Sequence, residues 1–569
     1  MSPTQLLSHF DRISEAPNAI PRLRRFILDL AVRGKLVEQN PRDEPASELL
    51  KQIQAEKERL VKAGEIRKGN PFPRFEANET PFASPAGWAW VRIRQVTSDR
   101  GQAIPDKDFT YIDVTAINKE VGCVVDAKVF LASDAPSRAR KLVRTGDVLY
   151  SCVRPYLLNV AVIENDIVPS PIASTAFAVL NGFGLVLSKY LWIVLRSPFM
   201  VECVEGKMRG QAYPAINDSD FALLPLPLPP FVEQQRIIAK VDELMALCDR
   251  LEASQAERES RRDRLAAASL HRLNNGADAD AFRNHARFYF NQLPRLMTRP
   301  KHIQQLRQTI LNLAVQGKLV PQDPNDEPAS ELLIRIQAEK ARLLKEGKIN
   351  SEKPPIPARA DELAFKLMPG WQVARISQIL VELQTGPFGS SLHQSDYQKD
   401  GTPVINPASI KNERLVPVES MAVGQKTLKR LATFKLRAGD IVMARRGEMG
   451  RCAVVTKDEN GWLCGTGSLI LRLPEFVIPH FFVTLIGSPF VREYLGSSAV
   501  GATMQNLNQS ILLNLVIGLP PLAEQQRIVD KVEELMALCG QLEAQLTTTQ
   551  TESRRLLEAV LHDALVSAA

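Results

Sequence analysis

The side chains best suited to chemistry in this sequence are arginines and lysines, which gather in two clusters without interspersed acids. The first cluster consists of Arg138, Arg140, Lys141 and Arg144. The second consists of Lys426, Lys429, Arg430, Lys435 and Arg437. Lysine and arginine neutralise phosphates, and arginine can bond both acceptors on the edge of a guanine. The clusters therefore indicate DNA contact, and a solvated charged surface is the alternative interpretation.

Both clusters end two residues before a Gly-Asp pair, Gly146-Asp147 in the first case and Gly439-Asp440 in the second. More cations follow each pair and join the candidate DNA contacts: Arg154, Arg445, Arg446 and Arg451. Matched positions in segments that otherwise differ favour a shared task. The net charge is only +7 over 569 residues, so any basic footprint must be local.

Two loops rich in amide side chains supply the other candidate contacts. Their members are Arg209, Gln211 and Asn217 in the first loop, and Gln505, Asn506 and Asn508 in the second. Asparagine and glutamine can bond both polar atoms on the edge of an adenine. The same residues beside glycine also build turns, which is the alternative interpretation.

Catalytic signatures are missing from the sequence. There is no GxxxxGK[ST] or GxGxxG phosphate loop, no methyltransferase loop for a flipped base, and no HExxH or GxSxG motif. Asp106, Asp126 and Lys128 fit the loose pattern of a nuclease in which two acids hold magnesium. Such triplets are common by chance, so we expect a surface without catalytic function there.

Cysteines and apolar residues indicate the cellular context. The seven cysteines include no CxxC pair, and no histidine is spaced to complete a zinc site. This usage predicts a reduced, cytoplasmic compartment and no bound metal. No stretch of 18 apolar residues occurs, and the first 17 residues carry charges and prolines. We therefore expect neither a membrane span nor a signal peptide.

The elements that position the candidate residues come from a tandem duplication. Residues 26–66 and 309–349 align at an offset of 283 with 29 identities in 41 positions. Residues 228–253 and 519–544 align at an offset of 291 with 19 identities in 26 positions. The segments between these blocks share only scattered anchors. The chain thus contains one helical frame twice, and each copy holds a different insert.

The second repeated block predicts a long helix with an apolar seam. The seam residues recur every three or four positions: Ile237, Val241, Leu244, Cys248 and Leu251 in the first copy, and Ile528, Val532, Leu535, Cys539 and Leu542 in the second. This period predicts a helix that pairs with another helix, as in a coiled coil. An ordinary amphipathic surface helix is the alternative, because the first seam turns polar at Gln255, Arg258 and Arg262.

The inserts have the pattern of mixed α/β domains. Short β-branched runs bounded by Gly, Pro and Asp predict strands within residues 121–125, 147–153, 159–163 and 441–443. Each insert ends in a stretch with helical character, at residues 185–195 and 479–486.

Taken together, these features resemble the DNA specificity subunit of type I restriction–modification enzymes. The resemblance rests on the duplicated motifs DEPASELL-x-x-IQAEK and LPP-x-x-EQQRI and on QTGPFGS at residues 384–390, and it runs from about residue 6 to 566. It implies an α/β (mixed α+β) fold with two target recognition domains, each reading half of a bipartite DNA site. Long antiparallel coiled-coil helices with internal pseudo-two-fold symmetry would join them and fix their spacing.

The resemblance also implies partners and a division of the chain. The subunit itself would bind no cofactor. Two modification subunits would bind S-adenosylmethionine and methylate adenine, and restriction subunits would use ATP and magnesium. The opening loops of the inserts become further candidate DNA contacts: Arg100 and Gln102, and Ser390 and Ser391. The implied segments are a helical region 1–84, recognition domain 85–230, central region 231–365, recognition domain 366–521 and a C-terminal helix 522–569.

Two other classes of function stay open on the residues alone. One is a nuclease or methyltransferase that acts without partners. The other is a protein-only coiled-coil scaffold whose inserts bind proteins rather than DNA.

Overall fold

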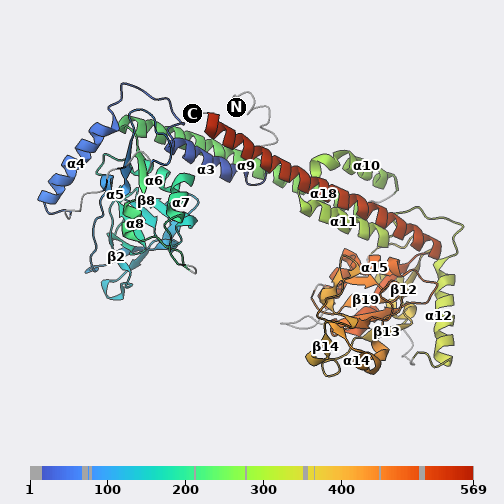
Figure 1. The fold of residues 1–569 in the computed structure, drawn as a ribbon. Helices are drawn as coiled ribbons and strands as arrows, with labels where there is room; N and C mark the ends of the chain where they lie inside the picture. The colour runs from blue at the N-terminus through green and yellow to red at the C-terminus, as the bar shows by residue number, and fades with distance from the viewer. Residues whose placement is uncertain are drawn as a thin grey trace. The chain divides into compact units, whose positions relative to one another are not determined.

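A computed structural model describes residues 16–66, 73, 75, 80–210, 213–275, 279–349, 356–363, 365–447, 450–498 and 507–567. The chain divides into two units, residues 1–258 with 549–569, and residues 259–548. Each unit combines one β-rich domain with helices (Figure 1). The fold is therefore mixed α/β, with two β-rich domains and long helices that pack together.

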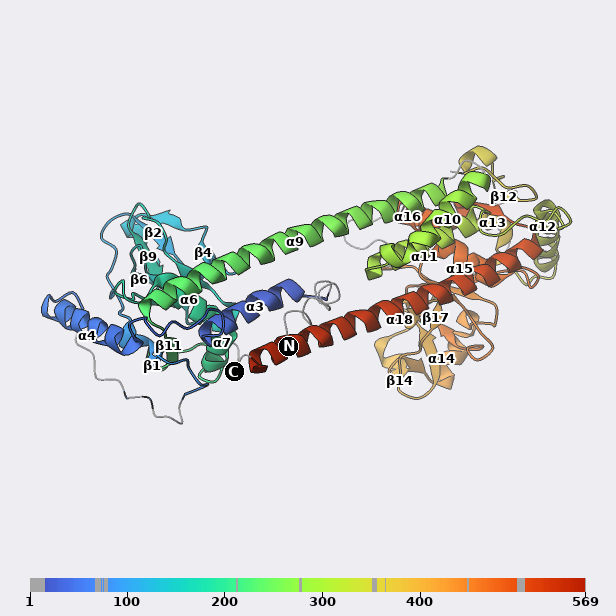
Figure 2. The ribbon, with the colours of Figure 1, turned by 90° about the horizontal axis from the view of Figure 1, so that it is seen from above.

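The helices of the first unit are α3 (Ala19–Val32), α4 (Ala46–Lys62), the first part of α9 (Phe231–Asn274) and the last part of α18 (Leu522–Ser567). Helix α3 runs antiparallel to α9, because Arg24 pairs with Asp249 at 2.5 Å while Gln39 bonds Glu233 at 2.8 Å. It runs parallel to α18, because Arg22 pairs with Glu558 and Lys35 donates to the carbonyl of Leu565. Helix α3 thus lies between the two long helices (Figure 2).

The second unit repeats this arrangement with α11 (Pro300–Val315) in the place of α3 and α12 (Ala329–Lys345) in the place of α4, and it adds α10 (Ala279–Leu296). Helix α11 runs antiparallel to α18: Arg307 pairs with Glu543 at 2.9 Å, and Gln322 bonds Glu524 at 3.0 Å. It runs parallel to the end of α9, where Lys318 donates to the carbonyl of Asn274. Most of these contacts match contacts of the first unit at the sequence offsets of 283 and 291, so the duplication extends to side-chain contacts as well as helices.

The predicted seam is buried in both units. Ile237, Val241 and Ile528 are fully buried, Cys248, Val532 and Cys539 are 6%, 6% and 1% exposed, and Leu244, Leu251, Leu535 and Leu542 are partly buried against the same cores. The first unit's core also contains α3, and the second unit's core contains α11 and the end of α9. The seam of α9 therefore packs in one core with α3. The seam of α18 shares a core with α11 and with the end of the other long helix.

The last part of the polar interval of the α9 seam, from residue 259 on, is paired inside the second unit. Glu259 pairs with Arg262 and Arg299, and the fully buried His302 places Nε2 2.6 Å from Asp263. Beyond it the apolar seam resumes at Ala266, Leu270 and Leu273, which belong to the second unit's core. Buried polar groups keep their place in a core when they are paired, so this interval does not interrupt the helix.

The first β-rich domain begins and ends on one antiparallel strand pair, β1 (Ala89–Arg92) and β11 (Pro225–Leu228). A three-stranded sheet has the order β10 (Phe177–Leu180), β7 (Val148–Ser151), β8 (Val160–Val162). A four-stranded sheet has the order β5 (Lys128–Phe130), β2 (Phe109–Ile112), β9 (Pro171–Ser174), β6 (Ala139–Leu142), and β3 (Ile117–Asn118) pairs with β4 (Cys123–Val124). Its helices are α5 (Ile93–Val96), α6 (Ser188–Arg196), α7 (Pro198–Glu205) and α8 (Asp218–Ala222).

The second β-rich domain repeats the plan between β12 (Gln372–Arg375) and β23 (Val516–Leu519). One sheet has the order β13 (Glu382–Thr385), β22 (Ser468–Arg472), β19 (Ile441–Ala444), β20 (Cys452–Val454), so that it gains an edge strand, β13. The other has the order β14 (Tyr397–Gln398), β18 (Ala422–Val423), β15 (Thr402–Ile405), β21 (Leu463–Cys464), and β16 (Ile410–Lys411) pairs with β17 (Arg414–Leu415). Its helices are α13 (Ile376–Ile379), α14 (Gln425–Arg430), α15 (Pro479–Gly487), α16 (Pro489–Ser498) and α17 (Gln509–Asn514).

The predicted strands and helices of the inserts are confirmed. Strands β4, β7, β8 and β19 fall at the four β-branched runs, and α6 and α15 fall at the two helical stretches. The strand pairs β1–β11 and β12–β23 lie within segments 85–230 and 366–521; the five-segment division itself stays a prediction. None of the described helices is long and apolar enough to cross a membrane.

Candidate DNA-reading surfaces

The shared Gly-Asp pair builds the same turn in both domains. In the first, the backbone N–H of Arg144 donates to the Asp147 carboxylate at 2.9 Å, and in the second Arg437 donates to Asp440 at the same distance. The glycine before each aspartate has a φ near +90°, a conformation that favours glycine. Each turn leads directly into an inner strand of a sheet, β7 or β19. The turn therefore fixes the position of the last residues of the basic cluster relative to that sheet.

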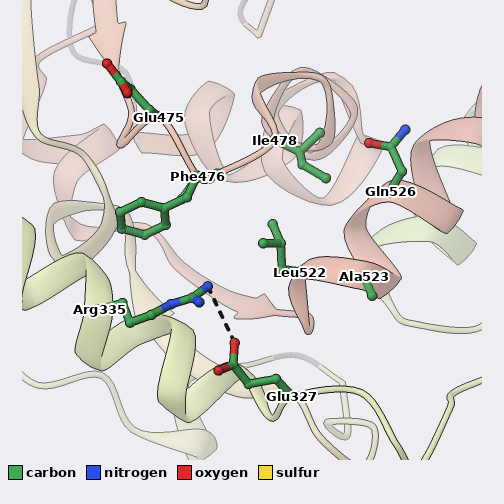
Figure 3. Close-up of a pocket in the computed structure, with 9 residues that line it drawn as sticks. Glu327, Arg335, Glu475, Phe476, Ile478, Leu522, Ala523 and Gln526 are labelled. Carbon is green, nitrogen blue, oxygen red and sulfur yellow. Dashed lines mark ion pairs between the residues drawn. The ribbon is translucent and has the colours of Figure 1, made fainter.

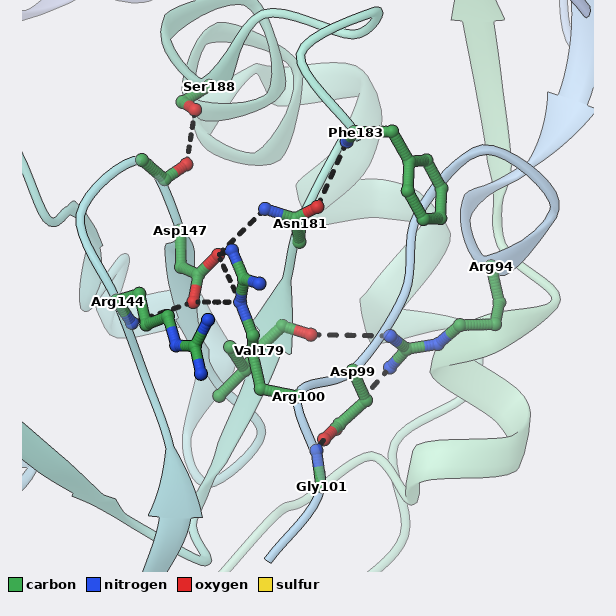
Figure 4. Close-up of polar contacts among 11 residues, drawn as sticks. Arg94, Asp99, Arg100, Gly101, Arg144, Asp147, Val179, Asn181, Phe183 and Ser188 are labelled. Carbon is green, nitrogen blue, oxygen red and sulfur yellow. Dashed lines mark hydrogen bonds and ion pairs between the residues drawn. The ribbon is translucent and has the colours of Figure 1, made fainter. Parts of the chain in front are cut away.

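In the first domain the aspartate of this turn is anchored by Arg100 (Figure 4). Asp147 is fully buried; it accepts bonds from Arg100 Nε and Nη2, both at 3.0 Å, and from Asn181 Nδ2 at 3.0 Å. In the second domain Arg472 takes the place of Arg100. Its Nε lies 3.4 Å from the Asp440 carboxylate, and it also pairs with Glu382 at 2.5 Å. Burial raises the pKa of Asp440. Arg100, a candidate DNA contact, is therefore used inside the domain.

The two basic clusters adopt different secondary structures. The first has Arg140 and Lys141 on strand β6, whose side chains alternate between the core and solvent, and Arg138 and Arg144 on either side of that strand. Arg138 and Arg144 are exposed and have no side-chain partner among the described residues, whereas Lys141 is 4% exposed and pairs with Asp99 at 3.0 Å and Asp218 at 3.5 Å. Arg140 is half-buried and donates to the carbonyl of its own neighbour. The strand thus presents only part of the cluster to a ligand.

The second cluster begins with helix α14, which buries Leu428 and turns its cations outward. Lys426 and Lys429 are exposed and have no partner among the described residues. Arg430 instead donates to the carbonyl of Ser391 at 2.6 Å and pairs with Asp396 at 2.8 Å. Bonds from the His393 backbone and from Arg430 lower the pKa of Asp396.

Arg430 thereby fastens helix α14 to the loop after β13, which carries the QTGPFGS motif. Ser390 is exposed on this loop, Ser391 is half-buried, and Phe388 is 67% exposed. Gly386 packs so closely on the backbone of Gly465 that a Cβ atom would lie 2.2 Å from its carbonyl oxygen. The loop is therefore held on both sides while its tip is open to a ligand.

The structure brings the arginine after each central strand together with the amide-rich loop. In the first domain Arg154 donates its backbone N–H to the carbonyl of Pro214 at 2.8 Å. In the second, Arg445 exchanges two bonds with the backbone of Leu507, at 3.0 and 3.1 Å. These residues lie far apart in the sequence, and only the fold brings them together.

The remaining candidates divide by their contacts. Asn217 and Asn508 cap the starts of α8 and α17 with their side chains, as the turn-building alternative predicts. Arg209 pairs with Asp220 at 3.1 Å, and its side chain is 78% exposed. Arg446 and Gln102 are exposed, and Arg451 is half-buried. Gln211, Gln505 and Asn506 lie outside the described residues.

No catalytic or metal centre emerges from the described part of the chain. It holds no group of three His, Cys, Asp or Glu residues that could bind a metal ion. Asp106, Asp126 and Lys128, the loose nuclease pattern, are all exposed. Their exposure favours the surface interpretation given above.

The frame of the second unit has an open groove of about 510 Å³ between α12 and the start of α18 (Figure 3). Arg335 lines this groove. Its Nη2 lies 3.5 Å from the Glu327 carboxylate, and its guanidinium carbon lies 5.4 Å from the centre of the Phe476 ring. In the first unit Gln52 holds the position of Arg335 and bonds Glu44 at 3.3 Å. The groove is therefore lined by the frame and by residues 475–478 of the second β-rich domain, and Arg335 on its frame side has no charged counterpart in the first copy.

Comparison with known proteins gives a consistent result. A model of the type I restriction modification DNA specificity domain matches residues 368–549. The specificity subunit of the type I restriction enzyme EcoEI from Escherichia coli is 32% identical over 562 residues, which cover 96% of this chain and 94% of that protein. The EcoAI specificity subunit from the same species is 30% identical over 569 residues, with the same shares covered.

A solved structure shares the fold. It comes from work on complex assembly and conformational transition of the type I R-M system, and its chain is 25% identical, with a TM-score of 0.52 over 85% of this chain and 99% of that chain. Relatives of this similarity extend over nearly the whole length, so they cover the frame as well as both inserts. The chain belongs to the DNA specificity subunits of type I restriction–modification systems, which are the non-catalytic subunits of these enzymes.

Proposed function

We propose that the chain reads a bipartite site in double-stranded DNA, with one half-site for each β-rich domain. The observation that carries this proposal is that two different basic surfaces stand at the same place in the two domains, ahead of the shared Gly-Asp turn. Both domains place exposed cations ahead of the Gly-Asp turn, yet in one they flank strand β6 and in the other they lie on helix α14. Exposed cations without protein partners suit phosphate contact, and the divergent loops beside them suit base reading.

The cations that support this proposal best are those without work inside the domain. They are Arg138 and Arg144 in the first domain and Lys426 and Lys429 in the second. Arg100, Lys141 and Arg430 hold buried or loop groups in place, so their contribution to DNA binding is to shape the surface. Arg154, Arg445 and Arg446 lie next to the amide-rich loops or on the same hairpin and are the candidates for base contacts.

We further propose that the frame docks two modification subunits, one in each unit. Helices α4 and α12 keep identical side chains at positions that face solvent in both copies: Gln54 and Gln337, Ala55 and Ala338, Lys62 and Lys345. Core packing does not require identity at exposed positions, whereas the inserts of the same chain have diverged. A surface kept twice fits the same partner twice.

The reactions of the assembled enzyme then belong to its partners. The modification subunits would supply S-adenosylmethionine and adenine methylation, and restriction subunits would supply ATP-driven translocation and magnesium-dependent cleavage. The cell compartment would be the cytoplasm, where the DNA lies. This division agrees with a specificity subunit that contributes no catalytic residues.

Co-expression of the chain with its modification subunits in a host free of adenine methylation tests the DNA-reading proposal. Sequencing of methylated bases should yield a two-part motif with an unspecified spacer, and the motif should vanish when this chain is omitted. Methylation by the chain alone, or cleavage by the chain with Mg²⁺, would instead support an independent enzyme. Assembled complexes that show no salt-dependent DNA binding would support a protein-only scaffold.

The docking proposal has a separate test. Replacing Ala338 by Arg introduces a bulky charge on the exposed face of α12, and native mass spectrometry should then find one modification subunit per chain instead of two. Ala55→Arg on α4 should have the same effect at the other copy, and Ala55→Ser serves as the conservative control. Two bound subunits in the double Arg variant would place the docking surface elsewhere.

A further inference from the structure

A surface turn of the first β-rich domain combines a strained arginine with an exposed aromatic ring. The turn follows strand β7 and contains the short 3-10 segment Pro155–Leu157. Arg154 before it has φ +47° and ψ 54°, and Leu158 after it has φ +58° and ψ 36°. Residues with a Cβ rarely adopt this left-handed conformation. At Arg154 the strain is greater, because the following proline disfavours such angles for the residue before it.

Hydrogen bonds to a second segment enforce the strained conformation. Arg154 donates its backbone N–H to Pro214, and Ile216 donates to the carbonyl of Cys152 at 3.0 Å. Val153 and Ala215 form a bridge between these two bonds. Backbone strain that the surroundings over-determine is characteristic of functional sites, so this turn is a candidate for one.

The side chain of Arg154 is ordered as well. Its guanidinium carbon lies 4.7 Å from the centre of the Tyr213 ring, while Tyr213 itself is 70% exposed. Arg154 Nε is buried and has no hydrogen-bond partner among the described residues. A planar guanidinium stacked on a ring keeps its outer edge available for two parallel hydrogen bonds.

We propose that Arg154, held by Tyr213, reads a guanine in the half-site of the first domain. Two features favour a base over a phosphate. A phosphate contact needs only a point charge, which the unpartnered Arg138 and Arg144 already supply, whereas bidentate reading of O6 and N7 needs a fixed plane. The strained backbone and the ring contact fix that plane before DNA arrives, so less side-chain entropy is lost on binding.

The equivalent place in the second domain is built differently, which limits the inference to the first. There the backbone of Leu507 takes a bond from Arg445 Nε, and none of the described aromatic rings stacks on that guanidinium. The two half-sites should therefore not share this contact.

The inference rests on the proposed function, and the test separates the two. The complete modification complex is assayed on DNA in which each position of the first half-site is varied in turn. With Arg154→Gly we expect discrimination at one G·C pair to fall by about 5- to 150-fold, since a bidentate pair contributes that much. Because glycine relieves the left-handed strain, the melting temperature of the variant should stay level or rise.

Leu158→Gly is the matched control. It relieves the same kind of strain at the other end of the turn, and it should leave the recognised motif unchanged. Tyr213→Ala, at an exposed position, should lower discrimination at the same base pair as Arg154→Gly, and Tyr213→Phe, which keeps the ring, should behave as the parent chain does.

Three results decide the matter. Loss of discrimination at one position, with the salt dependence of binding unchanged, supports the inference. An unaltered motif in Arg154→Gly and in Tyr213→Ala overturns it. Uniform weakening on all sequences, with a salt slope reduced by about one, overturns it in favour of a phosphate contact. A parent complex that yields no two-part motif would instead contradict the proposed function itself.

Discussion

The two β-rich domains position their basic clusters with different secondary structure elements. In the first, the middle of the basic cluster lies on strand β6, and the alternation of that strand buries Lys141 between Asp99 and Asp218. In the second, the cluster begins with helix α14, and its pitch leaves Lys426 and Lys429 in solvent. The Gly-Asp turn and the central strand that follow are the same in both. The Gly-Asp turn and the central strand are thus common to both domains, whereas the element that carries the basic cluster before them differs.

The largest expected effects come from substituting the aspartate of each Gly-Asp turn. Asp147→Ala removes the only carboxylate that pairs with the Arg100 guanidinium among the described residues. It should destabilise the first domain by about 3 kcal/mol, because the partly buried guanidinium loses its partner. Asp440→Ala should cost less, because Arg472 keeps its ion pair with Glu382. Hydrogen exchange of β7 and β19 measures both locally, since a chain of two units need not melt in one step. An equal loss of stability in the two variants would contradict the difference between Arg100 and Arg472 as partners of these aspartates.

The next prediction contrasts a buried lysine with an exposed one. Lys141→Met should lower the stability of the first domain by about 2 kcal/mol, since it leaves Asp99 without its hydrogen bond to a charged group. Lys429→Met should leave stability unchanged and lower the salt slope of DNA binding by roughly 0.9, the loss of one phosphate contact. Thermal melting and binding at several salt concentrations separate the two, and Lys429→Arg is the control that keeps the charge. A reversal of these outcomes would contradict the comparison of strand and helix.

A smaller effect should be the same in both units, because it concerns the frame. Lys35 and Lys318 donate to the carbonyls of Leu565 and Asn274, near the ends of the two long helices. Replacing either lysine by Met should fray the last turn at a cost of about 1 kcal/mol. Hydrogen exchange at residues 562–565 and 271–274 reports this fraying. A marked difference between the two would show that the frame copies are not equivalent.

The smallest expected effect is a pH dependence of the frame. Burial raises the pKa of Glu233 and of Glu524 above 4.5. The folded state therefore holds these protons more tightly than the unfolded state, and each group makes stability fall as pH rises from about 4.5 through the raised pKa. Glu233→Gln and Glu524→Gln should reduce this fall equally, measured as the difference from the parent chain in melting temperature against pH. No change in either variant would contradict the burial argument.

Much of the frame could be predicted from sequence because its signals are local. The seam from Ile237 to Leu251 follows a period that only a helix satisfies, and the two copies confirm each other. The duplicated block predicts the region around α3 as helical, but not that Ile20, Ile27 and Ala31 pack into the core of the first unit. The spacing of Ala139, Lys141 and Val143 places Lys141 on the inner face of a strand, which the charge of the cluster alone does not reveal.

Other parts of the site had no local signal. Arg100 anchors an aspartate 47 residues away, and the meeting of Arg154 with Pro214 depends on how β7 lies against a later loop. Nothing in the sequence around Arg154 indicates that its backbone is left-handed, because the conformation is imposed by that distant segment. Long-range contacts of this kind decide which cations remain available for DNA.

The central claim is that each insert carries its own half of the specificity while the frame carries none. Exchange of residues 85–227 for the corresponding insert of a related specificity subunit tests it most directly, with the methylated motif of the assembled complex as the measurement. The account predicts that one half of the motif changes while the other half and the spacer stay as they were. A hybrid in which both halves change would contradict it, and recognition would then be a joint property of the whole chain.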